Sequence, residues 1–314
     1  MRTILAGLML AAAVAGGAAR AQVIDDPEAT VVEALVVSAK LPGPAWWRIS
    51  DADTTVYILG TPGATPKGMT WDSSVADRRL NGAFALLTPP TLRAGLTDIP
   101  ALLRLRGKMK DDGDWAAAEP ALAARVQRAW AAVEPKDPDG WRDWKPLVLG
   151  GLIAGKTNRK AGLEYGQVSR RIEKLARKHR VKVRAAETYK AMPLIKTVAR
   201  QAEDSAGLVC LTETLDTVEQ SQDRYRVAAQ AWAEGRVRAA LTAPRSADRC
   251  QYLLPGVAEM SQRLKTAEVE ALANLLKTPG HAVALYPIRS LVAEGGVLDQ
   301  LRARGITVRT PGEG

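Results

Sequence analysis

The segment that most constrains the fold spans residues 46–60, WWRISDADTTVYILG, and is followed by the loop TPGATPKGM. β-branched, aromatic and apolar residues lie on both sides of a turn-forming stretch at residues 50–53, and the second run ends at Gly60. This pattern predicts a β-hairpin whose second strand ends in a glycine-containing loop. In open α/β sheets ligands bind at the carboxyl ends of strands. The loop after Gly60 is therefore the first candidate for a functional site.

Residues 1–21 have the pattern of a secretory signal peptide. Arg2 supplies the positive charge, residues 4–15 form an apolar run, and Ala19-Arg20-Ala21 resembles a cleavage site. The apolar run is too short to span a bilayer comfortably, and no other stretch approaches that length. We therefore expect an exported protein of a bacterial periplasm that is not transmembrane.

Cys210 and Cys250 are the two cysteines of the chain. In an oxidising compartment their default state is a disulfide, which would close a loop of about 40 residues and stabilise the fold by roughly 4 kcal/mol. The alternative is a redox-active or nucleophilic cysteine. Neither cysteine, however, has a CxxC partner or a histidine nearby.

The positive charge of the chain is concentrated in one segment. The formal net charge is +10, and residues 156–184 contain eleven Lys or Arg against Glu164 and Glu173, a local net charge of +9. Within this segment an apolar stripe predicts a helix that exposes five cations: Arg170, Arg171, Lys174, Arg177 and Lys178. These cations either form a solvated surface or bind anions such as lipid head groups, lipopolysaccharide or acidic polysaccharide. The expected compartment excludes nucleic acid.

Residues 22–43 are predicted to form an N-terminal extension or linker before a single domain at residues 44–310. The extension begins with acidic residues and continues as VVEALVVSAK before a Pro-Gly-Pro sequence. Residues 31–40 resemble the TonB-box-like segment of outer-membrane receptors. The alternative interpretation is an added strand or a tether.

Apolar periodicity and breaker residues predict the remaining elements. Helices are expected at residues 72–87, 99–109, 118–133, 144–154, 206–241 (one helix or a pair), 256–277 and 297–305, and strands at residues 181–183, 281–288 and 306–310. Four tryptophans in the helical region, at positions 115, 130, 141 and 144, either stack on carbohydrate or pack between helices.

The hairpin sequence, followed by Pro66, Gly68 and Trp71, resembles the beginning of the TraB/GumN family, which includes the Tiki-type metalloproteases. The resemblance implies an α+β fold of the EreA/ChaN-like type, with a mixed central β-sheet flanked by helices and a helical insertion. The family usually has Gly-Thr-x-His at this point, with the histidine as a metal ligand. This chain has Gly60-Thr61-Pro62-Gly63.

Two further stretches carry the resemblance. Gly162-Leu163-Glu164 and Ala186-Glu187-Thr188 match a family pattern in which the second glutamate is functional, although Glu187 can also be a loop or helix-capping residue. Near the C-terminus, VLDQLRARGITV matches the family, and its preceding Gly-x-x-His-Leu falls on residues 287–291. Ser290 stands at the histidine position, or Arg289 if the alignment shifts by one residue.

The resemblance thus implies a vestigial site of Gly60, Gly63, Glu187, Arg289 and Ser290. A hydrolytic metal site needs about three His, Asp, Glu or Cys ligands that converge. His281 begins a predicted strand and lies roughly 20 Å from its far end, at about 3.3 Å per residue. His179 ends the basic helix, away from Glu187. We therefore expect no metal and no cofactor.

The sequence favours a catalytically inactive periplasmic protein that binds or scaffolds envelope polysaccharide or protein partners. The link to exopolysaccharide rests on the family name, and contact with a membrane surface would use the basic helix. A second hypothesis is a divergent metal-dependent peptidase or hydrolase with relocated ligands. A third is an adaptor of the TonB system that acts through residues 31–40.

Overall fold

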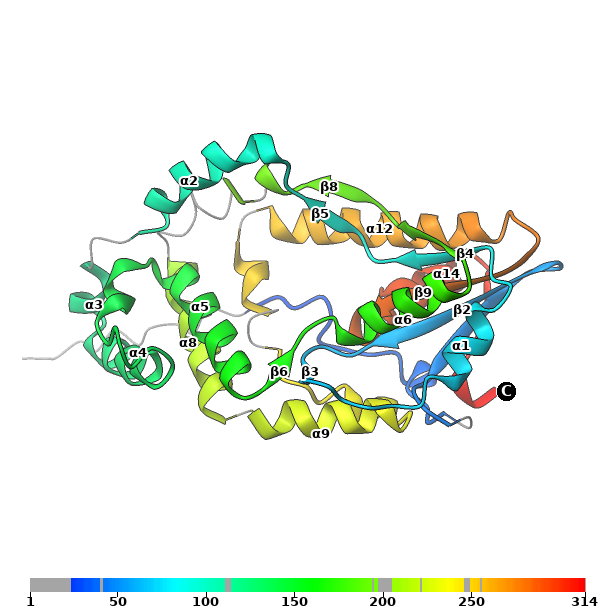
Figure 1. Ribbon diagram of the computed structural model, residues 1–314, viewed down its shortest axis with the longest axis horizontal. Helices are drawn as coiled ribbons and strands as arrows, with labels where there is room; N and C mark the ends of the chain where they lie inside the picture. The colour runs from blue at the N-terminus through cyan, green and yellow to red at the C-terminus, as the bar shows by residue number, and fades with distance from the viewer. Residues whose placement is uncertain are drawn as a thin grey trace, which may run out of the picture.

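The computed structural model describes residues 24–39, 42–110, 114–193, 195–196, 205–220, 222–245, 249–254 and 256–313. The protein is elongated, with a β-sheet at one end and a group of helices at the other (Figure 1). A six-stranded sheet has the strand order β10-β1-β2-β9-β4-β7. This mixed sheet flanked by helices confirms the predicted α+β class.

The predicted hairpin is confirmed. Strand β1 (Trp46–Ser50) pairs antiparallel with β2 (Thr54–Thr61), and the turn between them is held by the Asp51 carboxylate. Its Oδ1 accepts hydrogen bonds from the backbone N–H of Asp53 at 3.2 Å and of Thr54 at 2.8 Å. Such self-capping by aspartate is typical of tight turns.

The other strands of the sheet come from distant parts of the chain. Strand β2 pairs parallel with β9 (Gly280–Pro287), β9 with β4 (Ala85–Thr88), and β4 with β7 (Lys182–Ala185), whereas β10 (Thr307–Arg309) pairs antiparallel with β1. The carboxyl ends of β2, β9, β4 and β7 therefore share one edge. In this sheet, β1 alone runs against the other strands.

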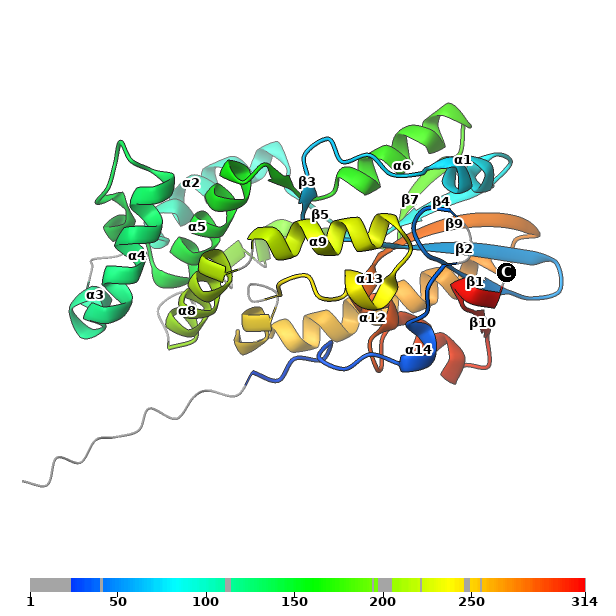
Figure 2. The same ribbon diagram turned by 90° about the horizontal axis from the view of Figure 1, so that it is seen from below.

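Helices cover both faces of this sheet (Figures 1 and 2). One face carries α1 (Ser74–Leu80) and α6 (Gln167–Lys178), and the other carries α12 (Val257–Leu275), α13 (Ile288–Val292) and α14 (Val297–Ala303). The core between these layers is apolar and includes fully buried Trp47, Ile58 and Leu285. Burial of this kind supplies most of the free energy that favours folding.

The predicted helix at residues 72–87 is wrong in its second half. Helix α1 ends at Leu80, Gly82 adopts a positive φ of 78°, and residues 85–88 form β4. All four residues of β4 are buried between β9 and β7. A strand buried on both faces lacks the alternation that would mark it, so its apolar residues fit a helical pattern equally well.

The helical end of the molecule is inserted between strands of the sheet. It contains α2 (Ile99–Lys108), α3 (Asp114–Ala118), α4 (Pro120–Val133), α5 (Pro146–Lys160) and α8 (Ser205–Gln220). Two short ribbons connect it with the sheet: β3 (Thr65–Pro66) with β6 (Leu163–Glu164), and β5 (Thr91–Arg93) with β8 (Thr188–Lys190). The described part is completed by α9 (Gln222–Ala233), α10 (Val237–Ala240) and five 3₁₀ turns at 33–35, 96–98, 140–143, 251–253 and 311–313.

The tryptophans of the helical end pack inside it. Trp130 and Trp141 are buried in a second core with Leu149 and Leu211, and the ring of Trp115 meets that of Trp141 edge-on at 5.6 Å. These positions match the packing interpretation rather than carbohydrate stacking.

Residues 24–39, which were expected to form an extension or linker, pack against the rest of the chain. Leu35 is fully buried, and its carbonyl accepts a hydrogen bond from Trp47 Nε1 at 3.2 Å. Val31 forms an antiparallel bridge with Ala293. Residues 31–39 thus form a 3₁₀ turn between two isolated bridges, at Val31 and Ser38, rather than a regular added strand. None of the described helices combines the length and apolarity that crossing a membrane requires.

Cys210 and Cys250 are buried and lie at disulfide distance, as predicted, with their Cα atoms 5.1 Å apart. The bond ties α8 of the helical end to the segment that precedes α12. We expect reduction, or the Cys210→Ser/Cys250→Ser double variant, to lower the free energy of unfolding by about 4 kcal/mol, because a 40-residue loop is released. Denaturant unfolding with and without reductant measures this loss. The double variant should not respond to reductant, and equal stability of all forms would contradict the prediction.

Candidate ligand pocket

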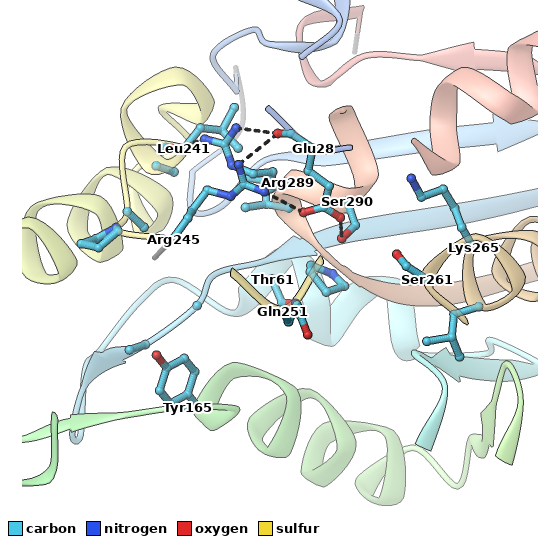
Figure 3. A pocket seen from close by; sticks show the side chains of 18 of the residues that line it. Glu28, Thr61, Tyr165, Leu241, Arg245, Gln251, Ser261, Lys265, Arg289 and Ser290 are labelled. Carbon is cyan, nitrogen blue, oxygen red and sulfur yellow. Dashed lines mark hydrogen bonds and ion pairs between the residues drawn. The ribbon is translucent and has the colours of Figure 1, made fainter. Parts of the chain in front are cut away.

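A pocket of about 340 Å³ opens where β2 and β9 end. The chain leaves β2 through Thr61 and Gly63, and it leaves β9 through Pro287 into α13. The opposite wall is one side of α12 (Figure 3). The carboxyl ends of parallel strands are a common position for ligand sites, so this pocket is the candidate site of the fold.

Three residues of the predicted vestigial site, Gly63, Arg289 and Ser290, line this pocket together. They come from sequence positions more than 200 residues apart, and the parallel pairing of β2 with β9 brings them to one edge. Neither Gly60 nor Glu187 is among the described residues that line the pocket.

Gly60 is needed for packing. A Cβ atom at this position would lie 2.9 Å from Ile288 Cγ1 and 3.0 Å from Trp47 Cζ3. The carbonyl of Gly60 also accepts a hydrogen bond from Trp232 Nε1 at 2.6 Å. By contrast, a Cβ at Gly63 would meet nothing within 4 Å. The two glycines of the loop motif therefore have different physical roles.

We expect Gly60→Ala to lower the free energy of unfolding by about 1–3 kcal/mol, as overpacking of a close-packed core does. Gly63→Ala is the matched control and should change it by less than about 0.5 kcal/mol. Chemical denaturation of both variants measures the difference. Equal stability of the two variants would show that the close contacts at Gly60 relax without penalty.

Glu187 lies at the end of β7, as expected, but on a different ribbon. Its carbonyl accepts a hydrogen bond from Thr91 N at 2.9 Å, and its carboxylate accepts one from the Tyr189 hydroxyl at 2.5 Å. Burial, together with this hydrogen bond, raises the pKa of Tyr189 to about 12. Glu187 therefore stabilises the β5–β8 ribbon and does not line the pocket.

The pocket also contains an acidic side chain that the sequence did not place there. Glu28, from the N-terminal segment, accepts a hydrogen bond from Ser290 Oγ at 2.5 Å. Its carboxylate also forms an ion pair with Arg245 at 3.3 Å. Arg245 also pairs with Asp26 at 2.5 Å. The acidic beginning of the extension was visible in the sequence, but no local pattern indicated where it would dock.

Arg289 faces the same group. Its Nη1 donates to the carbonyl of Glu28 at 3.2 Å, and its Nη2 donates to the carbonyl of Leu241. Burial lowers the pKa of Arg289, and the nearby Arg245 lowers it further, whereas Glu28 and Asp26 raise it. The guanidinium stays charged because its ordinary pKa is far above neutral, and its carbonyl and carboxylate neighbours compensate the buried charge.

Helix α12 presents a polar stripe to the pocket. Ser261, Lys265 and Glu268 line it at helical spacing, with Leu264 between them. Lys265 is 6% exposed and Glu268 is 9% exposed, which is rare for charged residues. These residues interrupt the apolar pattern predicted for residues 256–277, and the sequence offered no signal that they face a cavity.

Burial raises the pKa of Glu268 to about 7, and the negative charge of Glu28 adds to the rise, whereas the Lys265 ammonium opposes it. A carboxyl group that titrates near neutral pH in a cavity can hold or release a proton under ordinary conditions. Glu268 is therefore the group of the pocket best placed for acid–base chemistry.

The raised pKa of Glu268 makes stability depend on pH. Its ordinary value is 4.5, so the unfolded chain is ionised above that pH while the folded protein stays protonated up to about pH 7. The free energy of unfolding should therefore fall as pH rises from about 4.5 to 7, by up to roughly 3 kcal/mol. The Glu268→Gln variant should not show this decrease in the free energy of unfolding, because glutamine does not titrate.

We expect the difference in Tm between Glu268→Gln and the wild type to become more positive from pH 5 to pH 8. Glu259→Gln, at an exposed position of the same helix, is the control and should show no such trend. Thermal unfolding at several pH values measures the difference. A pH-independent Tm difference for Glu268→Gln would contradict the raised pKa.

The five cations of the predicted basic face lie on α6 and none lines the pocket. Three of them are paired with carboxylates: Arg170 with Glu164, Arg177 with Glu173 at 3.8 Å, and Lys178 with Asp77 at 3.1 Å. Arg171 donates to Ser73 Oγ at 3.1 Å and lies over the Trp71 ring, while Lys174 is exposed. Local pairing therefore reduces the field that a ligand would meet at this face.

The two histidines lie away from the pocket. His179 Nε2 is 2.9 Å from Asp77 Oδ1 beside α6. His281 pairs with Thr55 at the other end of β9, and its Nε2 lies 3.1 Å from the Arg79 carbonyl. Within the part of the chain that the structure describes, no three His, Cys, Asp or Glu residues gather as metal ligands.

The fold and the pocket define an α+β protein with a helical insertion and a site at the carboxyl ends of parallel strands. The chain belongs to the TraB/PrgY/gumN family, whose model matches residues 45–310. No curated protein and no solved structure was similar enough to the chain to be matched.

The metal that the Tiki-type resemblance implies does not fit the described residues. The matched positions carry Gly63 and either Ser290 or Arg289, which lack an imidazole. Of the two carboxyl groups among the described residues of the pocket, Glu28 is already held by Ser290 and Arg245, and burial favours the protonated form of Glu268. A guanidinium in the same place also opposes a divalent cation by charge repulsion.

Proposed function

We propose that the protein is an exported, non-catalytic member of the TraB family that binds a cell-envelope polysaccharide or protein in the pocket at the ends of β2 and β9. One observation carries this proposal: Arg289 and Ser290, at the position expected for the second metal ligand, bind Glu28 of the same chain. The site has the donors of a ligand-binding pocket, in place of a metal-ligand set.

The rest of the pocket supports binding of a polar ligand. Lys265 and Ser261 lie on the pocket side of α12, and Tyr165 faces them across the cavity (Figure 3). A small number of polar groups on a largely preformed wall is the usual design of a ligand site. Export rests on the signal-peptide pattern of residues 1–21, which lie outside the described residues.

A second candidate is a hydrolase that uses relocated groups, and the observation that favours it is the pair Glu28 and Glu268. Both carboxyl groups line the pocket, and the pKa of Glu268 is raised to about 7. A carboxyl group with a raised pKa beside a second carboxyl group in one cavity can take part in acid–base chemistry. The engagement of Glu28 by Arg245 and Ser290 opposes this role, because it removes free lone pairs.

Metal content separates these functions. We expect purified protein to carry no stoichiometric Mn, Co or Zn, and to show no hydrolysis of peptides that a chelator abolishes. Elemental analysis and a peptide-cleavage assay with each metal added back measure both properties. Stoichiometric metal together with chelator-sensitive cleavage would overturn the proposal, and cleavage that a chelator does not affect would favour the Glu268 hydrolase.

Binding itself is tested by thermal shift with envelope oligosaccharides and peptides. An active ligand should raise the Tm of the wild type, and Lys265→Met, which keeps the aliphatic stem, should abolish that rise. Lys174→Met on exposed α6 is the matched control. Loss of the shift in the Lys174 variant instead would place the binding surface on the basic helix.

A further inference from the structure

Residues 24–32, which we call the N-terminal strap, place two carboxylates in a site beside the pocket that is formed by Arg245, Arg289 and Ser290. Arg245 and Asp26 are joined in a fork, with Nη1 to Oδ2 at 2.5 Å and Nη2 to Oδ1 at 3.0 Å. Their side chains are only 15% and 6% exposed. Two parallel bonds between a guanidinium and a carboxylate are among the strongest and most specific polar contacts in proteins.

The second acidic residue of the strap is held by three partners. Glu28 accepts Ser290 Oγ through Oε1 at 2.5 Å and Arg245 Nη2 through Oε2 at 3.3 Å, and its carbonyl accepts Arg289 Nη1 at 3.2 Å. The two acids are preset by a turn, since Asp26 Oδ1 accepts the Glu28 N–H at 3.0 Å. Figure 3 shows Arg245, Arg289 and Ser290 converging on Glu28.

The strap continues by pairing with the backbone at the end of α13. The N–H of Val32 donates to the Val292 carbonyl at 2.9 Å, and the N–H of Glu294 donates to the Thr30 carbonyl at 3.1 Å. An extended segment that adds itself to free backbone groups is a general mode of peptide recognition. The strap therefore binds as a peptide ligand would, with two acidic anchors and a single antiparallel bridge at Val31.

Apart from these polar contacts, Val31 and Val32 pack against the main core as partly buried residues. Asp25, Pro27, Ala29 and Thr30 are exposed, and the first fully buried apolar residue is Leu35. The cations cannot simply be uncovered, however, because a buried charge that loses its partner is strongly destabilising. A ligand with the same two carboxylates removes this obstacle, since the cations exchange one set of partners for another.

We propose that Arg245, Arg289 and Ser290 form a recognition site for a partner polypeptide that presents an Asp-x-Glu turn followed by a short extended segment, with residues 24–32 as its internal occupant. The inference deepens the proposed binding function and rests on its protein-partner form. The strap keeps the site closed to weaker anions, and a partner must compete with it.

The test uses the full chain with Asp26→Asn/Glu28→Gln, which removes both anchors while keeping side-chain size. The probe is a fluorescent peptide of residues 24–34, IDDPEATVVEA, and its control has Asn and Gln in place of the second Asp and the first Glu. We expect the acidic probe to bind the variant at least about 10-fold more tightly than the wild type, because the internal competitor is weakened. Asp25→Asn, an exposed neighbour, should behave as the wild type.

Two further measurements keep the result clear if the variant loses stability. Hydrogen exchange should show faster exchange of the Val32 amide in Asp26→Asn/Glu28→Gln, with the β2 amides unchanged. Adding Arg245→Gln to that variant should abolish probe binding.

Equal binding of the acidic and neutral probes, or no binding to any variant, would overturn the inference. Tight binding of polygalacturonate that the acidic peptide does not displace would assign the site to acidic polysaccharide instead and also overturn it. Neither result depends on metal content or on Lys265, so the failure of this inference and that of the proposed function are distinguishable.

Discussion

The parallel pairing of β2 with β9 is the contact on which the pocket depends. It runs in register from Thr54 opposite Gly280 to Thr61 opposite Pro287, and it joins segments separated by more than 200 residues. Because both strands are buried, the pairing is specified by burial as well as by backbone hydrogen bonds. This pairing places the loop with Gly63 beside the start of α13. Gly60 has no Cβ atom, which allows β2 to lie close to Ile288 at the start of α13.

Charge compensation then shapes the pocket. Arg245 and Arg289 lie together in a poorly solvated place, where two cations without partners would be strongly unfavourable. Asp26 and Glu28 supply the opposite charges from the N-terminal segment. Glu268 lines the same pocket. Burial raises its pKa to about 7, and the negative charge of Glu28 adds to this rise.

Membership of the TraB/PrgY/gumN family leaves the chemistry open, because a fold specifies where a site lies and the site residues specify what it does. The sheet, the two larger cores and the Cys210–Cys250 bond are built from apolar packing, strand pairing and a covalent link. Side chains at the strand ends can therefore change their chemistry without loss of the scaffold. In this chain Arg289 and Ser290 bind an acidic segment of the same polypeptide.

Much of the fold could be read from local patterns, since a hairpin turn at Asp51 or an apolar stripe at Val168 and Ile172 depends on neighbours a few residues away. The short strand β4 could not, because burial on both faces removes its alternation. The family resemblance predicted that Gly63, Arg289 and Ser290 belong to one site. The register of β2 with β9 brings all three to the same pocket.

The sequence by itself, with its family resemblance, determined the class of fold, the hairpin, the cysteine pair and the concentration of positive charge in residues 156–184. Only the tertiary structure decided that Glu28 and Glu268 enter the pocket, that Glu187 does not, and that most cations of α6 are paired locally. The reason is physical: secondary structure follows from short-range periodicity, whereas the environment of a charged side chain is set by groups that folding brings from distant positions.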